Sequence, residues 1–207
     1  MTNLIVSSGV SVMLLSARII FTENISYIFL LWNLFLAWIP LLISMNINGN
    51  KSKQKIFLML CTWLLFFPNS PYIITDLFHF RPRGIPLWFD LVLIVSFAWN
   101  GMMLGFISLF QVQKYFDEKF GKIKSWMMVL SVFVLCGFGI YLGRYGRFNS
   151  WDVLVNPFEL MSEIIQTIIH PLRSKETYSV TMLFSTFLFC CYSTIFALVK
   201  SHKHEND

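Results

Sequence analysis

The sequence predicts an all-α protein, a polytopic bundle of transmembrane helices, because the chain is apolar, sparsely charged and rich in long apolar runs. Of its 207 residues, 56% are hydrophobic and only 13% are charged, and the mean hydropathy is +0.63. A soluble domain carries about 25% charged residues. No polar stretch is long enough to fold alone, so we expect a single integral membrane domain over residues 1–207.

Six apolar runs are long enough to be membrane spans. They cover approximately residues 4–22, 25–45, 56–79, 87–111, 126–143 and 178–199. The first begins at Leu4 with no Lys or Arg before it, so we interpret it as a retained span and not as a signal peptide. All four cysteines lie within apolar runs, which is typical of small buried side chains.

The lysines predict how the spans are oriented. Nine of the ten lysines lie in three connections that the positive-inside rule assigns to the cytoplasm. They are Lys51, Lys53, Lys55, Lys114, Lys119, Lys122, Lys124, Lys200 and Lys203. Both termini are then cytoplasmic. No basic patch interleaved with aromatic residues is present, so the lipid bilayer is an expected partner and nucleic acid is not.

The arginines follow a different pattern, at or beyond the outer ends of the spans. They are Arg18, Arg81, Arg83, Arg144, Arg147 and Arg173. Arginine holds a carboxylate or phosphate in a planar, two-point fork that lysine cannot provide. The alternative is that these side chains reach outer headgroups and pair with acidic residues of the same loops.

The third run is interrupted by Pro68 and Pro71, where backbone groups would be left facing lipid. Such breaks persist where the segment is packed in protein or lines a polar cavity. Pro68 is about 20 Å along the helix from Lys55, toward the outer face. Asn69 or Ser70 can cap a second half-helix with Pro71 at its first position, and its partly positive end would point into the membrane.

Beyond the break, Tyr72, Asp76 and His79 share one face if the segment is α-helical. Asp76 and His79 can exchange a proton, or they can form a pair that fixes the end of the helix. Zinc takes three or four protein ligands, so two are weak evidence and no metal is predicted. No phosphate-binding loop, zinc-protease helix or nucleophile elbow is present, and we predict no cofactor.

The fourth run carries Asp90 near its outer end and Asn100 about 15 Å deeper. Asn33, Asn69 and Asn100 all fall in the middle or outer half of the spans. Amides buried in lipid need partners, and these three can pair with one another or line a ligand site. The spacing of Gly101 and Gly105 favours close helix packing.

Two further outer segments are rich in polar residues. Residues 144–152 combine Arg144, Arg147, Asn149 and Asp152, either as a binding loop or as a loop held by Arg–Asp pairing. Residues 156–170 begin with an N-cap, a proline and Glu159, which indicates an amphipathic helix lying in the outer interface.

Three motifs identify a resemblance to a family. They are Leu65-Phe-Phe-Pro-Asn-Ser-Pro-Tyr-Ile-Ile-Thr-Asp-Leu-Phe-His79, Gly139-Ile-Tyr-Leu-Gly-Arg144 and Arg147-Phe-Asn-Ser-Trp-Asp152. They resemble the bacterial family catalogued as domain of unknown function 1361, over nearly the whole chain. The resemblance implies a multi-pass protein of the bacterial plasma membrane and no particular activity.

Together these features predict an outward-facing polar pocket that binds the phosphate of a lipid or lipid-linked substrate. The proposed ligand-binding residues are Asn69, Tyr72, Asp90, Arg144, Arg147 and Asn149, and the proposed catalytic residues are Asp76, His79 and Asp152. A membrane scaffold in which these residues only pair with one another is the main alternative. A small transporter is a weaker one, because the inner half offers little polar lining beyond Gln111.

Overall fold

A computed structural model describes residues 1–47, 52–80, 86–170 and 174–204. Lys51, Arg81, Arg83 and Arg173 therefore lie outside the described residues. The chain forms two compact units, residues 1–119 and 120–207, which are treated separately below. The single membrane domain expected from the sequence stays a prediction.

The described residues contain helices and no strand, which confirms the all-α fold class. Five helical segments are long and apolar enough to cross a membrane. The remaining predicted span, the second (residues 25–45), forms a helix of 16 residues, Phe29–Ser44. At 1.5 Å per residue this helix is about 24 Å long, a little less than the hydrocarbon core.

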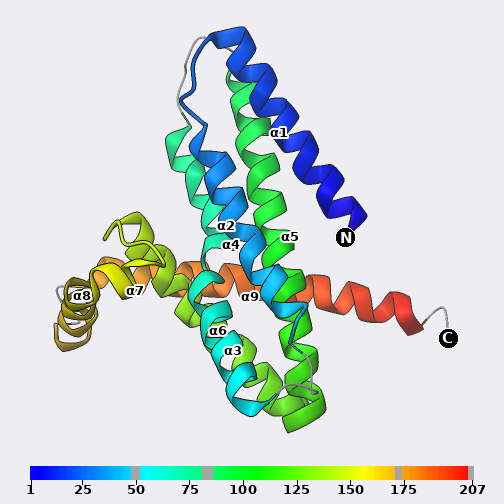
Figure 1. The fold of residues 1–207 in the computed structure, drawn as a ribbon, viewed down its shortest axis with the longest axis vertical. Coiled ribbons are helices and arrows are strands. Elements are labelled where there is room, and N and C mark those ends of the chain that lie inside the picture. Colours follow the sequence, from blue (N-terminus) through cyan, green and yellow to red (C-terminus); the bar gives the residue numbers. More distant parts are fainter. Residues whose placement is uncertain (48–51, 81–85, 171–173, 205–207) are drawn as a thin grey trace. The chain divides into compact units, whose positions relative to one another are not determined.

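The first unit consists of helices joined by short connections, with α1 and α5 side by side (Figure 1). They are α1 (Thr2–Thr22), α2 (Phe29–Ser44), α3 (Lys53–Phe66), α4 (Asn69–Tyr72), the 3₁₀ helix η1 (Ile73–His79) and α5 (Leu87–Phe120). Helix α2 packs against α3 and α4. The core of this unit includes Tyr27, Leu30, Leu93 and Phe97, all completely buried.

Helix α5 continues well beyond the predicted end of its span at residue 111. Most of the connection expected between residues 112 and 125 is therefore helical, because its residues suit a helix as well as a loop. The chain breaks only at Gly121, whose φ of 83° is one that glycine adopts without strain.

The second unit contains α6 (Lys122–Arg144), α7 (Asp152–Val155), α8 (Pro157–Ile169) and α9 (Lys175–His204). Helices α6 and α9 pack antiparallel, since Trp126 meets Phe196 near one end and Gly137 meets Thr181 nearer the other. A Cβ on Gly137 would lie 2.5 Å from the Thr181 carbonyl oxygen, so glycine allows the two backbones to approach closely.

The expectation that the cysteines are buried is correct only for Cys136. Cys61 and Cys190 are exposed on their helices, and Cys191 is half-buried. An apolar run cannot distinguish a lipid-facing side from a packed one, because both are apolar in a membrane protein.

Candidate functional site

The break in the third span lies where the two prolines predict it, between α3 and α4. Its backbone is rearranged locally: Ser70 N donates to Phe67 O at 3.1 Å. The Asn69 side-chain amide donates to Phe66 O at 2.9 Å, so it satisfies a carbonyl group at the end of α3. The predicted N-cap is therefore wrong, because α4 has no side-chain cap and begins directly after Pro68.

The break is packed against protein, through the two glycines of α5. A Cβ on Gly101 would collide with the Ser70 carbonyl oxygen and lie 2.8 Å from Ile73 Cδ1. A Cβ on Gly105 would lie 2.9 Å from Ser70 Cβ. The Ser70 hydroxyl also donates to Ala37 O on α2 at 3.1 Å. The irregular backbone is thus covered by α5 and held by α2, as a bilayer requires.

Asp76 and His79 lie on η1, which is a 3₁₀ helix and not the α-helix assumed from the sequence. With about three residues per turn, positions i and i+3 are aligned. The predicted common face of Tyr72, Asp76 and His79 is therefore replaced by a closer Asp76–His79 pairing, with Asp76 Oδ1 3.9 Å from His79 Nδ1. Tyr72 is half-buried at the end of α4, where its carbonyl accepts a bond from Thr75 Oγ1.

Asp76 is almost fully buried, whereas 44% of the His79 side chain is exposed. Asn33 Nδ2 on α2 donates to Asp76 Oδ2 at 2.8 Å. The His79 ring packs against Phe29, with 5.1 Å between ring centroids. At 3.9 Å the carboxylate and the imidazole are within ion-pair distance but beyond hydrogen-bond distance, so a proton exchange between them needs a small movement of the exposed ring.

Asp90 is paired with Arg18 in the interior of the first unit. Arg18 Nε donates to Asp90 Oδ1 at 2.7 Å, and both side chains are almost completely buried. Arg18 also donates to Asn24 O and lies over the Tyr27 ring, with 4.3 Å from Cζ to the centroid. Arg18 Nη2 reaches the second carboxylate oxygen of Asp90 at 3.4 Å. Asp90 thus joins α5 to α1, through a partner on another span and not in its own loop.

Asn100 bonds to α1 and also to its own helix, where Nδ2 donates to Ser96 O at 2.9 Å. Its Oδ1 accepts from Ser7 Oγ at 2.6 Å, and its Nδ2 donates to Ser11 Oγ at 3.0 Å. Figure 1 shows α1 in blue running beside α5 in green. A groove of about 760 Å³ lies along these two helices, with Ser7, Ser11 and Asn100 among its otherwise mostly apolar lining. Asn33 and Asn100 therefore bond to residues other than the predicted asparagine partners.

The second unit contains the other four predicted site residues: Arg147 and Asn149 lie in the loop between α6 and α7, Arg144 ends α6 and Asp152 begins α7. Arg144 is half-buried in the last turn of α6, where a cation favours the helix dipole. Asp152 Oδ2 accepts a bond from the Asn149 backbone N–H at 2.6 Å, so this carboxylate closes the loop. The Asn149 side chain is exposed.

Arg147 is exposed and has a left-handed backbone, with φ of 59°. Residues other than glycine are uncommon in the left-handed region of backbone φ and ψ. In the part of the chain that the structure describes, the Arg147 guanidinium makes no hydrogen bond or ion pair. The loop therefore presents one arginine to its surroundings, and sequence reasoning could not separate it from the buried Arg18.

Helix α8 begins at Pro157 and ends at Ile169, which confirms the predicted helix and its limits. Asn156 is its N-cap residue but makes no side-chain cap bond. Tyr178 Oη donates to Thr167 O at 3.1 Å and joins α8 to α9. Large apolar side chains along α7 and α8 remain exposed: Val153, Leu154, Val155, Phe158, Met161, Ile165, Ile168 and Ile169. A helix of this kind suits the interface of a bilayer.

The structure thus brings Asp76, His79 and Asn33 together in one unit, and Arg144, Arg147, Asn149 and Asp152 in one loop of the other. The pocket predicted to combine the two sets stays a prediction. Among the described residues, no group of three or more His, Cys, Asp and Glu side chains is suitable for a metal ion.

Long apolar helices with buried polar pairs define an integral membrane protein of the helical class. The family model described as "Protein of unknown function (DUF1361)" matches residues 32–191, so the chain belongs to that family. No curated protein and no solved structure matches the chain. The resemblance read from the sequence motifs is therefore confirmed.

Proposed function

We propose that this membrane protein binds the phosphate of a lipid or lipid-linked substrate through the loop of residues 144–152. The observation that carries the proposal is Arg147, an exposed guanidinium with no partner in the described residues. Phosphate and guanidinium form short, charge-assisted bonds in a two-point geometry. Arg144, three residues earlier at the end of α6, supplies a second cation to the same loop.

A lipid is the favoured carrier of that phosphate because of the helices that follow the loop. Phe158 is 89% exposed and Leu154 is 83% exposed, so α7 and α8 present apolar side chains next to a cationic loop. Apolar residues of this kind enter the acyl region while the cation meets the headgroup. Asn149, with its exposed side chain, adds a neutral donor to the proposed ligand set.

Proton transfer, in the enzymatic form of the proposal, belongs to Asp76 and His79. Asp76 would orient the imidazole and His79 would accept or donate the proton. This form also expects Asp152 to share a cavity with them. Asp90 leaves the proposed ligand set, because Arg18 already occupies it, and Asn69 and Tyr72 keep backbone roles in the break.

The proposed setting is the plasma membrane of a bacterium, with both termini in the cytoplasm and the loop on the outer side. The alternating lysine and arginine pattern supports this orientation. Cysteine labelling of residues 3 and 149 with an impermeant reagent on intact cells would test it. Labelling at residue 149 alone supports the orientation, whereas labelling at residue 3 alone contradicts it.

The binding itself is tested with phosphatidylglycerol and the variant Arg147→Gly. Glycine accepts the φ of 59°, so this variant removes the guanidinium without straining the loop. Native mass spectrometry in detergent should then show one fewer tightly held phosphatidylglycerol, with an affinity loss of about tenfold or more.

Lys175→Gln is the matched control, because it removes an exposed charge from the first turn of α9, at the same end of the helix pair as Arg144. It should leave the number of bound lipids unchanged. Equal binding by the native protein and Arg147→Gly would contradict the proposal, and so would an equal loss in the control.

A scaffold is the second candidate function, and one observation favours it. The Arg18–Asp90 pair is buried and joins α1 to α5, as expected of a pair that holds two spans together. A scaffold predicts that Arg147 binds a protein and not a lipid. Retained lipid binding in Arg147→Gly, together with loss of a co-purifying protein, would favour the scaffold.

A further inference from the structure

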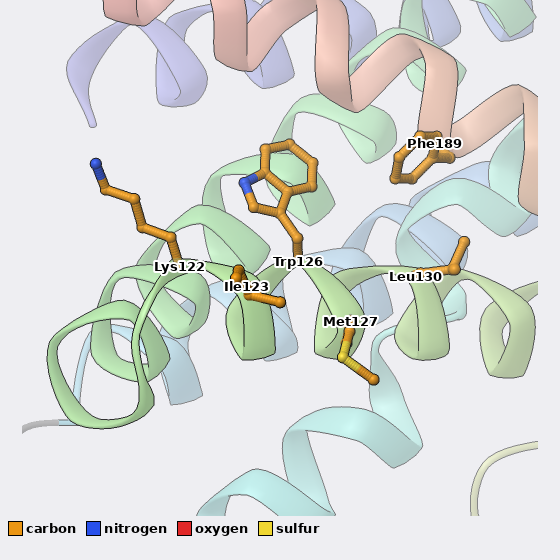
Figure 2. A pocket seen from close by; sticks show the side chains of 6 residues that line it. All are labelled: Lys122, Ile123, Trp126, Met127, Leu130 and Phe189. Atoms are coloured by element: carbon orange, nitrogen blue, oxygen red, sulfur yellow. The ribbon is translucent and has the colours of Figure 1, made fainter.

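A second groove lies on the surface of the second unit, at the end of α6 opposite to the arginine loop. We call it the α6 groove; it measures about 450 Å³ and is lined by Lys122, Ile123, Trp126, Met127, Leu130 and Phe189. All of its lining except one residue is apolar or aromatic, and the single charge is the Lys122 ammonium at one end (Figure 2). From Lys122 to Leu130 the groove follows α6 for about 12 Å.

Trp126 is held in place by three aromatic rings of α9. Its ring lies edge-on to Phe189, Tyr192 and Phe196, at centroid distances of 6.1, 6.3 and 5.1 Å. The indole nitrogen is on the edge of the ring that faces the Lys122 side in Figure 2. The direction of this N–H group is therefore fixed by packing and does not depend on a ligand.

Two donors at this end of the groove have no acceptor. Neither the Lys122 ammonium nor the Trp126 indole N–H makes a hydrogen bond within the residues that the structure describes. Lysine carries three donor hydrogens and indole carries one, and neither can accept. An occupant with acceptor oxygens could bond to both donors at the rim of the groove, and the charge of the exposed Lys122 favours an acidic one.

We propose that the α6 groove binds one anionic glycerophospholipid. Its phosphate oxygens accept bonds from Lys122 and Trp126, and one acyl chain lies over Met127, Leu130 and Phe189. A polar tip beside a long apolar strip matches the shape and polarity of such a lipid. An apolar helix of a partner would cover the same strip but would bring no negative charge to match Lys122.

This inference does not depend on the arginine loop, because Lys122 and Arg144 lie at opposite ends of α6. The two sites can therefore be tested separately. The probe is phosphatidylglycerol with a photoactivatable group on its acyl chain, added to the purified full-length protein in detergent. Crosslinked residues are identified by peptide mass spectrometry.

The proposal predicts labelling within residues 122–130 and around Phe189. Unlabelled phosphatidylglycerol should compete, and phosphatidylcholine should compete much less. Lys122→Gln and Trp126→Phe should each reduce this labelling about fivefold. Phenylalanine keeps the aromatic packing and removes only the N–H donor, so a purely structural role of Trp126 would leave the labelling intact.

Lys124→Gln is the matched control, because Lys124 is exposed in the same helical turn but does not line the groove. It should retain full labelling, and so should Arg147→Gly. The proposal is overturned if phosphatidylcholine competes equally, if Lys124→Gln loses as much labelling as Lys122→Gln, or if the crosslinks fall elsewhere.

Discussion

The two units of this protein use polar side chains in opposite ways. The first unit buries its ionisable and amide groups between helices, with Arg18, Asp76, Asp90 and Asn100 all at most 2% exposed. In the second unit the buried polar groups are mainly hydroxyls, and Arg147 stands exposed in a loop.

The difference indicates where a ligand can act. A polar or charged group buried in a membrane protein is costly in free energy unless it is paired. In the first unit the partners come from neighbouring helices. Those pairs hold α1, α2, η1 and α5 together and leave His79 as the most accessible member. In the second unit, by contrast, packing relies on aromatic rings and close glycine contact, and the Arg147 side chain is exposed.

The largest effect should come from filling the contact between α5 and the broken span. Gly101→Leu places a side chain against the Ser70 carbonyl and Ile73, where backbone cannot move aside. We expect loss of folded protein, measured as the monodisperse fraction after detergent extraction. Gly9→Leu is the control, because nothing lies within 4 Å of a Cβ there. Equal yields of the two variants would contradict the packing.

The next effect tests the buried ion pair of the first unit. Arg18→Met leaves the Asp90 carboxylate buried without its partner, which costs about 3–5 kcal/mol. The double variant Arg18→Met/Asp90→Leu should recover most of that stability in thermal unfolding. If the double variant were as unstable as the single one, the pair would have a role beyond mutual neutralisation.

A smaller effect is expected at the Asn100 cluster. Asn100→Ala removes bonds to Ser7 and Ser11, but both hydroxyls can turn to backbone carbonyls of their own helix. Interhelical bonds in membranes average about 0.6 kcal/mol, so we expect a loss of about 1 kcal/mol in unfolding free energy. A loss as large as that of Arg18→Met would show that the amide cluster holds α1 to α5 as strongly as the ion pair does.

The smallest effect on stability should be that of Arg147→Gly. An exposed side chain with a left-handed backbone contributes little to folding, and the change should stay within about 0.5 kcal/mol. Thermal unfolding without added lipid would measure it. A loss above about 2 kcal/mol would mean that Arg147 supports the loop and would move it into the same class as Arg18.

Local features of this fold are predictable from the sequence because local residues determine them. The proline break at Pro68, the limits of α8 and the close contact at Gly101 follow from turn chemistry, helix-start signals and small-residue spacing. The 3₁₀ geometry of η1 does not, since the residues Ile73–His79 carry no local signal that separates a 3₁₀ helix from an α-helix.

Partners that are far apart in the chain also could not be predicted from the sequence. Nothing in the sequence links Arg18 to Asp90, which are 72 positions apart, or Asn33 to Asp76. The sequence does not distinguish one arginine from another, and only the structure separates the buried Arg18 from the exposed Arg147. The α6 groove is hidden for a similar reason, because Trp126 and Phe189 come from different helices.

One measurement tests most directly the claim that the arginines of the two units have different roles. It is the rate at which each arginine reacts with a dicarbonyl reagent in the folded, detergent-solubilised protein, read by peptide mass spectrometry. We expect Arg147 to react rapidly and to be protected by phosphatidylglycerol but not by phosphatidylcholine, while Arg18 stays unmodified. Reaction of Arg18 as fast as Arg147, or no protection of Arg147 by the anionic lipid, would contradict the account.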